Sequence, residues 1–156
     1  MKLEGERSFD APREVVWHAI SDPAQMAALM PGVQSFDVVD PDHFNAKVKI
    51  PLGLGAIELA IDFEQTERRE PEFSSLKASG RGVGAALSMQ TSFRLEESDG
   101  GTTMHWAAEV SIAGPVGAMG QRVLQPIVRQ QVDRVLTTLE QQVAATDPSP
   151  PATVDS

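Results

Sequence analysis

The side chains that could do chemistry are few and scattered in this sequence. The chain has three histidines, His18, His43 and His105, and no cysteine. No two histidines have the spacing that would bring them together on one helix or across one hairpin, so the pattern favours neither a zinc site nor a histidine base. The sequence also lacks a nucleophile motif, a phosphate-binding loop and paired inward-facing carboxylates. We therefore expect no metal site and no catalytic residue.

Inward-facing polar groups are equally scarce. Thr91 is the one polar residue that the strand pattern turns clearly inward, and Arg122, near the start of the last helix, is the best candidate to orient a polar ligand group. A cavity with a single hydroxyl is poorly equipped for acid–base catalysis. The protein is therefore expected not to be an enzyme.

Apolar periodicity predicts the elements that position these groups. A first strand at 2–9 precedes two short helices at 10–22 and 23–30, with Asp10 as the expected N-cap of the first. From Val33 the period is two, which predicts strands at 33–40, 43–50, 57–68, 75–81, 86–97 and 102–112. The expected class is α+β: an antiparallel, seven-stranded curved sheet with its apolar face wrapped around a long C-terminal helix at 114–143.

The long helix contains residues that weaken helices. Gly114, Gly117, Gly120 and Pro126 fall within it, and an interior glycine or proline costs about 1 or 3 kcal/mol relative to alanine. We expect a kink at Pro126 and an ordinary core-packing helix beyond it. The glycines either loosen the first half over the end of the sheet or let it approach the sheet backbone closely.

Strand parity brings the glycine-rich, apolar segments 30–32, 51–56, 80–85 and 114–120 to one end of the sheet. We expect them to form the mouth of an apolar cavity between sheet and helix, although the same residues could fill a core. The expected ligand-binding residues, with Met104 beside them, are Val48, Ile50, Leu52, Leu54, Leu59, Ile61, Phe63, Leu87, Met89, Trp106, Met119, Val123 and Ile127.

Composition limits the partners and the compartment. The net charge of −9 argues against a nucleic-acid partner, because phosphate binding needs a basic surface. Neither an apolar signal segment nor an apolar run of about 18 residues occurs, so the cytoplasm is the expected location. Residues 146–156 are rich in Pro, Ser and Asp, which predicts a disordered tail after one domain at 1–145.

Three segments resemble a known family. These are "LMPGV" at 29–33, "KVKIPLGLGAIE" at 47–58 and "GPVGAMGQRVL" at 114–124, and they look like the CoxG family of carbon monoxide dehydrogenase. The order of elements resembles the helix-grip fold of lipid-transfer and polyketide-cyclase domains, over residues 1–145. The resemblance implies a non-catalytic accessory protein of a molybdenum-containing carbon monoxide dehydrogenase. With the apolar cavity, it suggests a carrier of respiratory quinone, such as menaquinone, between membrane and enzyme.

Many members of that family carry a linker and an apolar C-terminal segment, whereas this sequence ends in "PSPPATVDS". We therefore expect peripheral, transient contact with the inner face of the cell membrane through the glycine-rich end. Two alternatives stay open. One is a ligand-free assembly or membrane-recruitment factor for the dehydrogenase. The other is a cyclase or aromatase type of enzyme, which would need Thr91 with help from Arg122 or Gln131.

Overall fold

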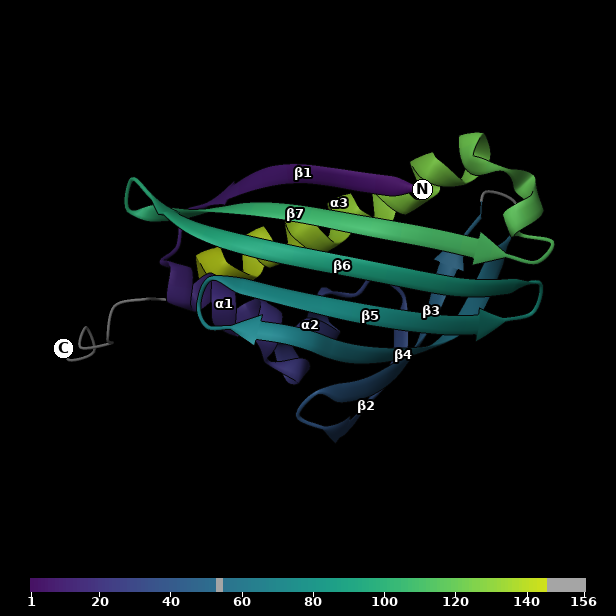
Figure 1. Ribbon diagram of the computed structural model, residues 1–156, viewed down its shortest axis with the longest axis horizontal. Helices are drawn as coiled ribbons and strands as arrows, with labels where there is room; N and C mark the ends of the chain where they lie inside the picture. The colour runs from purple at the N-terminus through teal and green to yellow at the C-terminus, as the bar shows by residue number, and fades with distance from the viewer. Residues whose placement is uncertain (53–54, 146–156) are drawn as a thin grey trace.

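A computed structural model describes residues 1–52 and 55–145 (Figure 1). Seven antiparallel strands form one sheet in the order β1-β7-β6-β5-β4-β3-β2. The strands are β1 (Lys2–Phe9), β2 (Val33–Asp40), β3 (His43–Pro51), β4 (Ala56–Arg69), β5 (Phe73–Gly82), β6 (Ala85–Ser98) and β7 (Gly101–Ala113). The long helix α3 (Gln121–Ala145) lies behind the sheet and crosses behind β7 and β6. The predicted α+β architecture is confirmed, including two short helices after the first strand.

Alternating apolar residues explain the sheet. Ile57, Leu59, Ile61 and Phe63 of β4 are all buried, whereas the residues between them are exposed. They pair in register with the inward residues of β3, for example Phe63 with Phe44. These strands therefore present one apolar face to the interior and one polar face to water.

The core divides into two clusters of buried residues. One joins β1, β7 and α1 to the C-terminal part of α3, and the other joins β3, β4 and β5. Leu87, Met89 and Phe93 of β6 pack against both clusters, yet each is only half-buried. The incomplete burial of these three large side chains marks a gap in the packing at the centre of the sheet.

The helix α1 (Arg13–Ser21) begins later than predicted. Its N-cap is Pro12, and no side chain caps it, so the prediction for Asp10 is wrong. Asp10 and Ala11 instead form a bend after β1. Ala11 is buried, and its carbonyl oxygen accepts a hydrogen bond of 2.7 Å from the Thr102 hydroxyl. Helix α2 (Pro23–Leu29) follows at once, with Asp22 as its N-cap.

The predicted long helix is divided at Gly120, so its expected start at Gly114 is wrong. A 3-10 turn, η1 (Gly117–Met119), precedes Gly120, whose φ of 89° lies outside helical geometry, and α3 starts at Gln121. Helix α3 then continues through Pro126 without interruption. At Gly117 any Cβ atom would collide with the carbonyl oxygen of Ile112, so this glycine serves close backbone approach. The division therefore comes from a glycine turn rather than from Pro126.

Candidate ligand-binding cavity

A cavity of about 310 Å³ lies between α3 and the inner face of the sheet. The indole of Trp106, the hydroxyl of Thr91 and the amide of Gln131 supply the polar side-chain atoms of its described lining, and the other lining side chains are apolar. No described carboxylate, imidazole or cationic side chain lines it. The cavity is thus suited to binding an apolar molecule, and its described lining offers no titratable side chain for acid–base catalysis.

The structure brings ten of the predicted site residues into the lining. They are Val48, Ile50, Leu52, Leu59, Ile61, Phe63, Leu87, Met89, Trp106 and Ile127. Leu54 lies outside the described residues. Met104 faces inward but is fully buried within the core cluster around β7 and does not reach the cavity.

Two predicted site residues lie elsewhere. Met119 and Val123 are 41% and 46% exposed, and neither belongs to the lining. Their placement assumed one continuous helix from Gly114, so that both would share a face with Ile127. The turn at Gly120 separates Met119 from α3, and Val123, although it lies on α3, falls outside the stripe of that helix that faces the cavity. The prediction that these two side chains point into the cavity is therefore wrong.

The C-terminal part of α3 contributes more than predicted. Val128, Val132, Val135, Leu136 and Leu139 all line the cavity, so the expectation that this part only packs as a core helix is wrong. These residues follow Leu124 and Ile127 at intervals of three and four, which is one stripe on a continuous helix. That spacing was visible in the sequence, but the expected kink at Pro126 obscured it.

Short helices also reach the cavity, a contribution that the sequence did not reveal. Ile20 of α1 and Met26 and Leu29 of α2 belong to the lining. Met26 and Met30 are four residues apart, a helical spacing that could have suggested a common face. Both helices contact α3, and the side-chain amide of Gln142 donates a hydrogen bond of 2.9 Å to Gln25 of α2.

The four segments predicted to form the mouth meet at one end of the molecule. The amide nitrogen of Val116 donates to the carbonyl oxygen of Gly84 at 2.8 Å, and that of Lys49 donates to Gly32 at 2.9 Å. Each segment also sends a side chain into the lining, as Met30, Leu52, Ala85 and Val116 do. Described residues of all four segments, which lie between the regular elements or at their ends, therefore contribute to the cavity.

Exposed apolar side chains gather on the outside of the same end. Val83, between Gly82 and Gly84, is 96% exposed, and Met119 and Val123 flank the turn at Gly120. Arg81 and Arg122 lie beside them in the sequence and are exposed too. Arg122 does not belong to the lining, so it is not placed to orient a ligand group inside the cavity. Within the described residues, no helix combines the length and the apolar character that crossing a bilayer requires.

The polar side chains of the lining differ in their hydrogen bonding. The Thr91 hydroxyl donates to the carbonyl oxygen of Ala107 at 2.9 Å. The amide nitrogen of Gln131 is buried and has no hydrogen-bond partner among the described residues. The Thr91 hydroxyl therefore has its hydrogen-bond acceptor within the sheet, whereas the buried amide nitrogen of Gln131 has no acceptor among the described residues.

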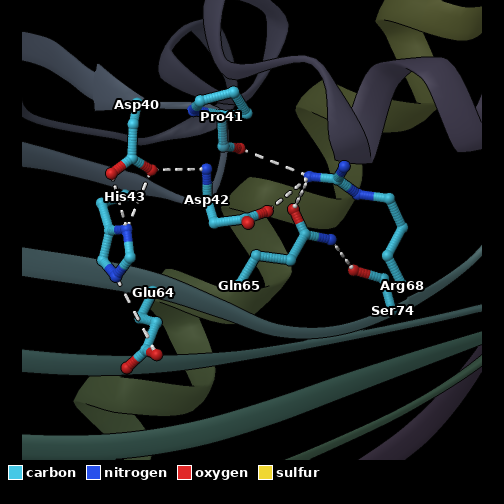
Figure 2. Close-up of polar contacts among 8 residues, drawn as sticks. All are labelled: Asp40, Pro41, Asp42, His43, Glu64, Gln65, Arg68 and Ser74. Atoms are coloured by element: carbon cyan, nitrogen blue, oxygen red, sulfur yellow. Dashed lines mark hydrogen bonds and ion pairs between the residues drawn. The ribbon is translucent and has the colours of Figure 1, made fainter.

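The titratable groups with shifted pKa values lie away from the cavity, in the turn between β2 and β3 (Figure 2). Nδ1 of His43 lies 2.8 Å from Oδ1 of Asp40, and its Nε2 lies 3.9 Å from a carboxylate oxygen of Glu64. The hydrogen bond raises the pKa of His43 above its usual value and lowers the pKa of Asp40. All three side chains are about half exposed, so this cluster is a surface ion-pair network.

Arg68 fastens the same turn to the sheet (Figure 2). Its guanidinium donates to Oε1 of Gln65 at 2.9 Å and to Oδ1 of Asp42 at 3.3 Å, while Nε2 of Gln65 donates to the buried Ser74 hydroxyl at 2.7 Å. None of these residues lines the cavity. Among the described residues, no three acidic or histidine side chains are arranged to hold a metal ion.

Comparison with solved structures supports the fold. A conserved protein from Geobacillus kaustophilus superposes with a TM-score of 0.87 at 19% identity, covering 92% of this chain and 95% of its own. A START superfamily protein from Mycobacterium smegmatis superposes with a TM-score of 0.72 at 12% identity, covering 92% and 97%. At these identities the likeness concerns the fold alone. No curated protein sequence matches the chain significantly.

The family comparison is more specific. The model of the carbon monoxide dehydrogenase CoxG family matches residues 5–144, which include nearly all of the sheet and of α3. Members of this family are accessory proteins, and membership implies association with carbon monoxide dehydrogenase. The resemblance found in the sequence is thereby confirmed: this chain belongs to the CoxG family of carbon monoxide dehydrogenase.

Proposed function

We propose that this protein is a non-catalytic carrier that takes an isoprenoid quinone, such as menaquinone, into the apolar cavity and presents it to carbon monoxide dehydrogenase. The cavity is the observation that carries the proposal. At about 24 cal/mol per Å³, the value for closed cavities, an empty void of about 310 Å³ would cost at most roughly 7 kcal/mol. The whole stability of a domain is about 5–15 kcal/mol. A void that lowers stability this much is best explained by a ligand that occupies it.

The size and the lining favour a flat, apolar ring with part of its chain. Ligand pockets commonly have volumes of about 300–1,000 Å³, so this cavity is at the lower end of that range. Trp106, Phe63 and Phe93 supply aromatic surface, and Met89 supplies an adaptable side chain. The ring and the first isoprene units fit such a volume, and the rest of the chain would leave through the glycine-rich end.

The outer surface of that end suits brief contact with a membrane. Val83, Met119 and Val123 offer exposed apolar side chains, with Arg81 and Arg122 nearby. A net charge of −9 repels anionic lipid, so contact must be confined to this end of the molecule. Loading would take place there, at the inner face of the cell membrane.

The competing functions have less support. A ligand-free assembly factor needs no internal void, so it leaves the cavity and its cost unexplained. A cyclase or aromatase needs convergent polar groups, but the Thr91 hydroxyl is bonded to the sheet and Arg122 is exposed outside the lining. Gln131 alone would remain in the described lining, and an amide is neither an acid nor a base. Carbon monoxide dehydrogenase is proposed as the partner because the chain belongs to the CoxG family. Family membership does not identify the ligand, which experiment must establish.

The two tryptophans allow a direct binding test. Trp106 lines the cavity, whereas Trp17 of α1 is buried in the core outside the lining. A quinone quenches indole fluorescence at contact, so Trp17→Phe, which keeps Trp106, should be strongly and saturably quenched by a short-chain naphthoquinone. Trp106→Phe, which keeps Trp17, should be quenched much less. Equal, non-saturating quenching in both variants would reject binding in the cavity.

A further inference from the structure

Gln131 has an unusual environment for a glutamine. It lies in the middle of α3, among Val128, Val132 and Val135, and it belongs to the lining of the cavity. Its amide nitrogen is buried and has no hydrogen-bond partner among the described residues. We propose that this amide donates a hydrogen bond to a carbonyl oxygen of the bound ligand and so selects quinone-like lipids over hydrocarbons. This inference rests on the proposed carrier function.

A buried donor without an acceptor destabilises a protein. An apolar side chain of similar length would fill the same position on this helix without that loss. The apolar surroundings also make a hydrogen bond to the amide stronger than it would be in water, once an acceptor arrives. The position of Gln131 is therefore unfavourable in the empty protein and favourable when a ligand brings an oxygen atom to it.

The other polar side chains of the lining are less suited to this role. The Thr91 hydroxyl already donates to Ala107. The N–H edge of the Trp106 indole lies against the backbone of Gly5 in β1: a Cβ atom added at Gly5 would be 3.0 Å from Nε1. Gln131 thus offers an uncommitted donor on the helix side of the cavity.

The same arrangement defines the chemical class of the ligand. The described lining contains no cationic side chain, so a buried carboxylate of a fatty acid would have no counter-charge and would be penalised. A neutral molecule with an apolar body and one accessible carbonyl oxygen satisfies both the lining and Gln131. Ketones and quinones belong to this class, whereas fatty acids and plain hydrocarbons do not.

The test combines a change in the protein with a change in the ligand. Gln131→Met removes the donor and keeps the length of the side chain, and Gln130→Met changes the exposed neighbour on the same helix. The probes are a short-chain naphthoquinone and the naphthalene that bears the same chain but no carbonyl group. Dissociation constants are measured by isothermal titration calorimetry, with thermal unfolding of each empty variant as a check on folding.

We expect the wild-type protein and Gln130→Met to bind the naphthoquinone more tightly than the naphthalene. Gln131→Met should bind the quinone about fivefold more weakly, the usual size of one neutral hydrogen bond, while its affinity for the naphthalene stays the same or rises. If Gln131→Met prefers the naphthoquinone as strongly as the wild-type protein does, the role of Gln131 is overturned and the carrier function stands. If the wild-type protein binds neither probe, the role of Gln131 and the carrier function are both overturned. If Gln131→Met does not fold, Gln131→Leu replaces it.

Discussion

Filling the cavity from the helix side should stabilise the empty protein and exclude its ligand. Val128 lies in the middle of the cavity-facing stripe of α3 and is only half-buried. Val128→Phe adds four carbon atoms, and at about 0.8 kcal/mol per buried carbon the gain is at most about 3 kcal/mol. Imperfect fit and ordering of the ring reduce this, so we expect a net gain of about 1–2 kcal/mol. For a domain of this size, that raises the melting temperature by about 2–8 °C.

The same substitution should weaken binding of a short-chain naphthoquinone at least tenfold, because the phenyl ring occupies the space of the ligand. Val123→Phe is the matched control: it makes the same change on the same helix, at a side chain that is 46% exposed and outside the lining. Its stability should change by no more than about 0.5 kcal/mol. Denaturant unfolding and calorimetric titration measure both effects. A loss of about 1–3 kcal/mol in Val128→Phe, typical of overpacking, would refute the cavity itself.

Four other predictions concern parts of the molecule outside the cavity. Pro126→Ala restores a backbone donor at an exposed position inside α3, so the free energy of unfolding should rise by about 1–3 kcal/mol; no gain in denaturant unfolding would mean that the helix already accommodates the proline. Gly117→Ala places a methyl group against the carbonyl oxygen of Ile112 and should lose about 1–3 kcal/mol in the same assay. Val83→Asp should reduce co-flotation with lipid vesicles and leave the melting temperature unchanged; unaltered flotation would place membrane contact elsewhere. The pKa of His43 is raised and that of Asp40 lowered, so their pairing adds stability only between those two values. It is lost as the carboxylate protonates at lower pH and as the imidazole deprotonates at higher pH. Asp40→Asn should return the pKa of His43, followed by NMR, toward its ordinary value.

The sheet was predictable because its information is local and repeated. Each residue of a strand points to the face opposite its neighbour, so the alternation in 57–63 fixes which side chains of β4 meet those of β3. Strand reversal then places every second turn at one end, which is why the segments 30–32, 51–56, 80–85 and 114–120 were correctly grouped: Met30, Leu52, Ala85 and Val116 all line the cavity.

The helix and the cavity were harder to predict. Helical spacing alone could not show that Gly120 adopts a positive φ, and this one residue separates Met119 from α3. Conversely, the cost usually assigned to an interior proline suggested a kink at Pro126 that does not interrupt α3. Whether apolar residues enclose a void or fill a core depends on the distance between sheet and helix, which is set by tertiary packing and not by the pattern of any single segment.

The central claim is that the cavity holds a quinone in the cell, and native mass spectrometry tests it most directly. The protein is isolated without detergent from bacteria that make menaquinone, sprayed under native conditions and then dissociated in the gas phase. We expect a fraction of the chains to carry one additional mass equal to that of the cell's quinone, and expect that mass to be absent from Val128→Phe and retained in Val123→Phe. A bound quinone that persists undiminished in Val128→Phe, or chains that remain free of any lipid even after incubation with menaquinone vesicles, would contradict the claim.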